Sequence, residues 1–148
     1  MNRMMIRATL FAGTLDILFA MILTIWRGKQ IPDMLRFVAS GPFPHATDMG
    51  TLGAVLGLLV HYTLMGIMAA TFFLWLDKQP RWRKRPYVAG LIFGLASYVV
   101  MNLVVVPIRF GTPFPPSMLA VATQLFAHVV LVGMVFASCV NRSRSRLS

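Results

Sequence analysis

A long uncharged segment near the middle of the chain constrains the fold more than any other feature. Between Gly50 and Leu76, twenty-seven residues carry no formally charged side chain, and a single histidine, His61, lies near their centre. About 20 apolar residues cross the hydrocarbon core of a bilayer, because each residue of a helix advances it by ~1.5 Å. The segment therefore predicts a membrane-spanning helix with an ionisable side chain deep inside it.

Three other apolar segments have the length of a spanning helix, at residues 8–26, 87–108 and 117–140. Of the 148 residues, 57% are hydrophobic and 12% are charged, against about 25% charged in a typical soluble domain. The first segment contains Asp16 and is followed by no A-x-A cleavage pattern, so we expect a retained helix and not a signal peptide. The sequence predicts an all-α integral membrane four-helix bundle, a single membrane domain over residues 1–148.

The connector between the first two segments predicts a helix of its own. Its apolar residues recur at helical spacing, at Ile31, Met34, Leu35 and Val38. Asp33 falls on the opposite side of such a helix. We expect a short amphipathic helix at the membrane interface in this first outer loop. Thr47 or Asp48 is suited to cap the second spanning helix. A proline-rich turn at residues 109–116 joins the third and fourth segments.

The distribution of Lys and Arg predicts the orientation. With the N-terminus in the cytoplasm, four basic residues lie outside, and ten lie inside: Arg3, Arg7, Lys78, Arg81, Arg83, Lys84, Arg85, Arg142, Arg144 and Arg146. This positive-inside bias predicts a multi-pass membrane protein with both termini cytoplasmic. We expect the basic loop at residues 78–85 to bind anionic lipid headgroups and not nucleic acid, because its charges lie at the ends of apolar segments.

Polar residues within the spans form the candidate functional site. His61 and His128 each lie eleven residues from the outer end of their segment, about 16 Å deep by the helical rise. Asp16 falls in the same middle zone, with Asn102 and Gln124 nearer the outer side. Glycines at four-residue spacing, such as Gly53 and Gly57 before His61, favour close approach of helices in lipid. We expect Asp16, His61, Asn102, Gln124 and His128 to form an interior polar cluster.

Several roles fit this cluster. The side chains can act as hydrogen-bonding contacts between helices. Asp16 with the histidines can instead relay protons or bind a small substrate in a carrier. Because four helices are few for a carrier, we expect such a protein to work as a homodimer or within a larger membrane complex. Alternatively, His61 and His128 are axial ligands of a haem, or join Asp16 in a two-histidine, one-carboxylate site for a transition metal, in a membrane redox protein.

Short motifs of soluble enzymes are missing from the sequence. It has no phosphate-binding loop, no nucleophile elbow and no H-E-x-x-H, and it contains no glutamate. We therefore expect a role other than catalysis, as an accessory or structural subunit or as a small carrier.

The sequence resembles a family of small uncharacterised bacterial inner-membrane proteins with four transmembrane helices. The resemblance covers most of residues 8–135 and rests on Gly13–Ile17, Ala39–Gly41, Leu59–His61, Gly90-x-x-x-Gly94, Met101–Pro107 and His128. It implies the four-span fold and a location in the bacterial inner (plasma) membrane. It also implies that Asp16, His61, Asn102 and His128 belong to a shared pattern.

Overall fold

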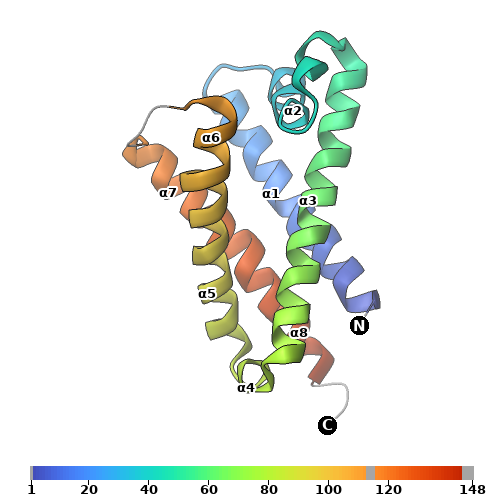
Figure 1. Ribbon diagram of the computed structural model, residues 1–148, viewed down its shortest axis with the longest axis vertical. Helices are drawn as coiled ribbons and strands as arrows, with labels where there is room; N and C mark the ends of the chain where they lie inside the picture. The colour runs from blue at the N-terminus through green and yellow to red at the C-terminus, as the bar shows by residue number, and fades with distance from the viewer. Residues whose placement is uncertain (1, 113–115, 145–148) are drawn as a thin grey trace.

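Four long helices run side by side in the computed structural model, which describes residues 2–112 and 116–144 (Figure 1). The first is α1 (Asn2–Trp26) and the second is α3 (Gly50–Lys78). All four are long and apolar enough to cross a membrane. The expected all-α four-helix membrane bundle is confirmed. The first helix extends further toward the N-terminus than residues 8–26, because the basic start of the chain is helical as well.

The third and fourth spanning helices each contain a π-helical segment. The third consists of α5 (Pro86–Tyr98), the π segment η2 (Val99–Val105) and α6 (Val106–Phe110). The fourth consists of α7 (Met118–Phe126), the π segment η3 (Ala127–Met134) and α8 (Val135–Arg144). Pro107 has no N–H to bond the Leu103 carbonyl, so one α-helical hydrogen bond is missing where η2 meets α6. Residues 113–115 of the predicted proline-rich turn, and Arg146, lie outside the described residues.

Both ends of the described chain lie at one end of the bundle, which we call the terminal end (Figure 1). The short helix α4 (Pro80–Arg83) connects α3 to α5 there. Phe72 is fully buried, and its ring lies 5.2 Å from Phe93 and 5.6 Å from Phe136. Ala8 and Ala12 of α1 join this core. All four spanning helices are therefore held together by apolar packing at the terminal end.

The opposite end is crossed by the predicted amphipathic helix, α2 (Ile31–Ala39), so we call it the α2 end (Figure 1). Leu35 of α2 packs with Ile17 of α1 and Ala54 of α3 in a second, smaller core. Gly53 and Gly57 let α3 lie against the loop and α2, because a Cβ at Gly57 would clash with the Leu35 carbonyl. The Gly53–Gly57 stripe is thus a packing face, but its partner is α2 and not another spanning helix.

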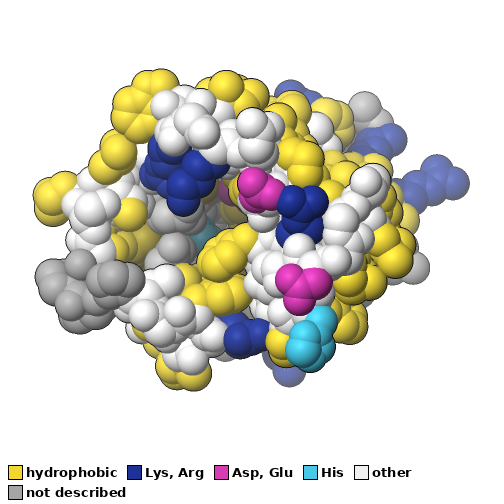
Figure 2. Space-filling view, turned by 90° about the horizontal axis from the view of Figure 1, so that it is seen from above, with side chains coloured by type: hydrophobic (Ala, Val, Ile, Leu, Met, Phe, Trp, Pro, Cys, Tyr) yellow, Lys and Arg dark blue, Asp and Glu magenta, His cyan; other side chains and the backbone are white. Residues whose placement is uncertain are grey.

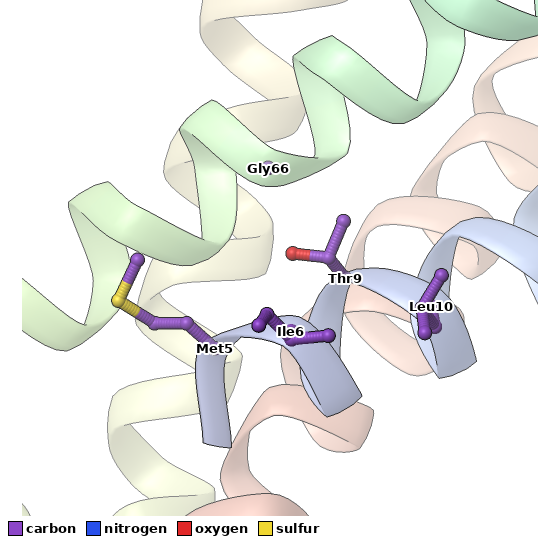
Figure 3. A pocket seen from close by; sticks show the side chains of 5 residues that line it. All are labelled: Met5, Ile6, Thr9, Leu10 and Gly66. Carbon is purple, nitrogen blue, oxygen red and sulfur yellow. The ribbon is translucent and has the colours of Figure 1, made fainter. Parts of the chain in front are cut away.

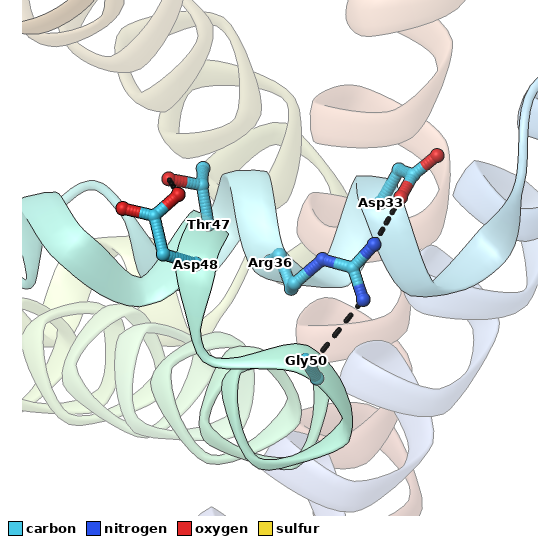
Figure 4. Close-up of polar contacts among 5 residues, drawn as sticks. All are labelled: Asp33, Arg36, Thr47, Asp48 and Gly50. Atoms are coloured by element: carbon cyan, nitrogen blue, oxygen red, sulfur yellow. Dashed lines mark hydrogen bonds and ion pairs between the residues drawn. The ribbon is translucent and has the colours of Figure 1, made fainter.

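The cap predicted for the second spanning helix is wrong. A 3₁₀ turn, η1 (Pro44–Asp48), precedes α3, and Met49 occupies the N-cap position without a side-chain hydrogen bond. Thr47 donates to Asp48 at 3.4 Å instead of to the helix. Arg36 of α2, which is paired with Asp33, donates to the Gly50 carbonyl at 3.3 Å (Figure 4). The entry to α3 is therefore held by α2, which only the folded chain brings there.

At the α2 end, α6 and α7 contact α1 and α2 through a small set of side chains. The rings of Phe37 and Phe110 stack 4.4 Å apart, and those of Phe19 and Phe126 lie 5.2 Å apart. Arg109 donates to the carbonyls of Ser40 and Gly41, at 2.6 Å each. Figure 2 looks onto this end and shows acidic and basic side chains around a central hollow, with a histidine visible at depth.

Candidate functional site

The first polar contact within the spans lies where α1 and α3 meet. His61 is 8% exposed, and its Nε2 lies 2.9 Å from the carbonyl oxygen of Gly13. Its Nδ1 lies 3.9 Å from Oδ2 of Asp16. A Cβ at position 13 would come within 2.9 Å of the Tyr62 ring, so Gly13 leaves the space in which that ring packs against α1. The close approach of the two helices is what lets His61 reach the backbone of α1.

The hydrogen bond to Gly13 determines how a proton is held between His61 and Asp16. A carbonyl oxygen only accepts, so Nε2 carries a hydrogen and Nδ1 is the ring nitrogen that faces the carboxyl group. In a pair without net charge, one proton is held either by the carboxyl group or by Nδ1. A small side-chain movement would bring the two atoms, now 3.9 Å apart, into hydrogen-bonding distance. The structure thus places a carboxyl group opposite one ring nitrogen of a buried histidine within the span.

A neighbouring hydrogen bond fixes the same crossing. The hydroxyl oxygens of Thr14 and Tyr62 lie 2.9 Å apart, and the Tyr62 ring meets His61 edge-on at a centroid distance of 5.4 Å. Sequence reasoning did not single out Thr14 or Tyr62. Their positions in the sequence were the available signal, because Tyr62 follows His61 directly and Thr14 precedes Asp16 by two residues.

The second polar contact joins the third and fourth spanning helices. His128 of η3 lies with Nδ1 3.1 Å from Oγ of Ser97 and with Nε2 3.1 Å from Nδ2 of Asn102. A Cβ at Gly94 would lie 2.7 Å from both the His128 carbonyl oxygen and the Val129 Cα. Gly94 therefore brings α5 and η3 close enough for both ring nitrogens of His128 to find partners.

These contacts admit one assignment of hydrogens. The Asn102 amide nitrogen only donates, so Nε2 of His128 accepts and Nδ1 carries the hydrogen. Nδ1 then donates to Ser97 Oγ, whose own hydrogen goes to the Gly94 carbonyl at 2.9 Å. His128 is consequently a neutral ring with both nitrogens engaged, in the tautomer opposite to that of a neutral His61.

The structure divides the predicted polar cluster into two contacts. Asp16 and His61 face each other, Asn102 and His128 are hydrogen-bonded, and Gln124 is half-buried with no hydrogen bond from its side chain within the described residues. No group of three or more His, Cys, Asp or Glu side chains in the described part of the chain is placed to hold a metal ion. The three-ligand site of His61, His128 and Asp16 is therefore not assembled. As an axial haem ligand through Nε2, each histidine would give up the hydrogen bond that this nitrogen makes here, His61 to Gly13 and His128 to Asn102.

No protein-family model, curated protein or solved structure was found to match this chain.

Proposed function

We propose that this protein is a small carrier of the bacterial inner membrane in which the Asp16–His61 pair binds a proton. The observation that carries the proposal is the geometry of that pair, a carboxyl group facing an imidazole whose other nitrogen is held by a backbone carbonyl. An ionisable side chain within a span is expensive to keep there and is commonly part of a proton or substrate pathway. Histidine suits this role because it titrates near neutral pH.

The arrangement of charges supports a specific orientation. With both termini cytoplasmic, the basic loop of Lys78, Arg81, Arg83, Lys84 and Arg85 lies on the side where anionic headgroups attract it. We further propose that the chain belongs with the small four-span bacterial proteins that its motifs resemble, and that it works as a homodimer, since four helices are few for a carrier.

Infrared spectroscopy tests the proton site directly. Asp16 is the one acidic residue in the middle of a spanning helix, because Asp33 and Asp48 lie outside the spans and Asp77 lies in the last turn of α3, where it pairs with Arg83. In reconstituted protein, a change of pH should produce a protonation band from a carboxyl group in an apolar environment. We expect this band to disappear in Asp16→Asn and to shift in His61→Gln. Asp48 and His45 are exposed, and the control variants Asp48→Asn and His45→Gln should leave the band unchanged.

Proton movement is then measured in vesicles that enclose a pH-sensitive dye. After an external pH step, the wild-type protein should speed the internal response relative to empty vesicles, and Asp16→Asn and His61→Gln should abolish that increase. A folded Asp16→Asn protein with both the wild-type band and the wild-type rate would overturn the proposal. Loss of the band without any wild-type proton movement would contradict the carrier and favour an accessory subunit.

A further inference from the structure

A groove between α1 and α3 opens on the apolar outer surface of the bundle, toward the terminal end. It measures about 390 Å³ and is lined by Met5, Ile6, Thr9 and Leu10 of α1 and by Gly66 of α3. Ile6 is 58% exposed and Leu10 is 54% exposed, so the groove faces the surroundings of the bundle and not its interior. Gly66 forms its floor on the α3 side, since a Cβ there would meet only Thr9, at 3.9 Å. In a membrane, such a surface meets lipid chains.

The Thr9 hydroxyl distinguishes this groove from an ordinary lipid-facing surface. Hydroxyls in the spans commonly bond the carbonyl four residues earlier, as do Thr24, Thr63, Thr71, Thr123 and Ser138. The Thr9 side chain makes no hydrogen bond within the described residues. Figure 3 shows it projecting from α1 toward Gly66, beside the side chain of Met5. A hydroxyl without a partner in apolar surroundings is costly, so a polar acceptor in the groove would be favoured.

A positive charge lies beside the end of the groove. Arg3 is exposed and precedes Ile6 by three residues and Leu10 by seven, so it shares their side of α1. The rise from Arg3 to Thr9 is about 9 Å along the helix axis. Arg7 lies instead toward α8, where its charge acts on the Cys139 thiol. Arg3 thus lies one turn before the lining residues along α1, and the groove itself combines an unpartnered hydroxyl with apolar side chains.

We propose that this groove binds one anionic phospholipid. The Arg3 guanidinium binds the headgroup phosphate, the Thr9 hydroxyl donates to an ester carbonyl of the lipid, and one acyl chain lies along Ile6 and Leu10 against Gly66. The order of chemical groups along α1 matches the order of groups in a phospholipid. The proposal is independent of the proton site, because no residue of the groove contacts Asp16 or His61 in the described structure.

Native mass spectrometry of protein delipidated in detergent and titrated with phosphatidylglycerol or phosphatidylcholine tests the site. The wild-type protein should retain one phosphatidylglycerol in preference to phosphatidylcholine. Gly66→Phe fills the groove, and we expect it to weaken retention about tenfold, the effect of losing burial for about two methylenes. Arg3→Gln should remove the preference for the anionic lipid, and Thr9→Val should weaken retention without a loss of stability.

Two matched controls keep the test specific. Ile67→Phe places the same ring on the neighbouring exposed position of α3, and Arg7→Gln removes the neighbouring charge of α1. Both should retain lipid as the wild-type protein does. The proposal would be overturned if folded Gly66→Phe retained lipid as the wild-type protein does. If Gly66→Phe does not fold, wild-type retention by both Thr9→Val and Arg3→Gln would overturn it. Loss of a dimer in Gly66→Phe with unchanged lipid retention would overturn it as well and would identify the groove as a contact between copies of the chain.

Discussion

The two intramembrane histidines differ in what their ring nitrogens contact. His61 donates from Nε2 to a backbone carbonyl and turns Nδ1 toward a carboxyl group, whereas His128 accepts at Nε2 and donates from Nδ1. One imidazole therefore faces a carboxyl group, and the other has both ring nitrogens engaged by side chains of the neighbouring helix. Similar depth in the sequence did not give them similar chemistry.

This difference predicts opposite tautomers. In ¹⁵N-histidine-labelled protein at neutral pH or above, we expect His128 to show its hydrogen on Nδ1 and a neutral His61 to show it on Nε2. The exposed His45 serves as the reference, since its spectrum should follow that of a solvent-accessible histidine. Nitrogen-15 magnetic resonance, with each signal assigned from a His→Gln variant, measures the result. The same tautomer in both intramembrane histidines would contradict the assigned hydrogen bonds.

Asn102 should contribute to stability through His128. Asn102→Leu removes the donor to Nε2 and leaves that nitrogen without a partner within the span. Hydrogen bonds of this kind between spanning helices are typically worth ~0.6 kcal/mol and up to ~1.7 kcal/mol, and we expect a destabilisation in that range. Unfolding in mixed micelles with a denaturing detergent provides the measurement. Val104→Leu on the exposed side of the same π segment is the control, and equal stability of the two variants would refute the role.

Glycines set the distance between spanning helices at the scale of whole elements. Gly90 and Gly133 lie against each other's backbones, and Gly94 lies against His128 and Val129, so α5 and η3 meet with almost no side chain between them. Such contact is favourable in lipid, where the hydrophobic effect gives little attraction between helices. The polar pair of Asn102 and His128 depends on this spacing.

Adding a methyl group to two different helical glycines, Gly94 and Gly66, should have opposite effects on stability. Gly94→Ala would push a Cβ to 2.7 Å from backbone atoms of η3, and we expect it to destabilise the protein by about 1–3 kcal/mol. Gly66→Ala should be neutral or stabilising by up to about 1 kcal/mol, because alanine favours the helix and its Cβ meets only ordinary contact with Thr9. Detergent unfolding of both variants compares them. A neutral Gly94→Ala would show that the two helices can separate without loss.

At the scale of the whole molecule, the two ends of the bundle are held by different interactions. The terminal end has the aromatic core around Phe72, to which all four spanning helices contribute. At the α2 end, Arg109 and Phe110 of α6 contact Ser40, Gly41 and Phe37 at the end of α2. None of these residues belongs to the core around Phe72, so losing their contacts would leave that core intact.

Loss of Arg109 should therefore loosen one end only. In Arg109→Gln, we expect a broader distribution of distances between spin labels at positions 48 and 108, because the donors to Ser40 and Gly41 are shortened or lost. Labels at positions 3 and 84, at the terminal end, should keep their wild-type distribution. Both pairs are measured by pulsed electron resonance in a Cys139→Ala background. Broadening at both ends would mean that Arg109 supports the whole bundle and not a local contact.

Much of the architecture follows from the sequence alone. Apolar length predicts the four spans, since a bilayer requires about 20 apolar residues in a helix, and helical spacing predicts α2. The residue types also identify Asp16, His61, Asn102, Gln124 and His128 as polar side chains within the spans. The partners of these side chains were decided by the tertiary structure. Gly13 offers a backbone carbonyl, which leaves no mark in a sequence pattern, and the π segments change which residues of neighbouring helices face each other. The order of the helices then placed His61 against α1 and His128 against α5, because close approach at Gly13 and Gly94 determines which polar atoms come within hydrogen-bonding distance.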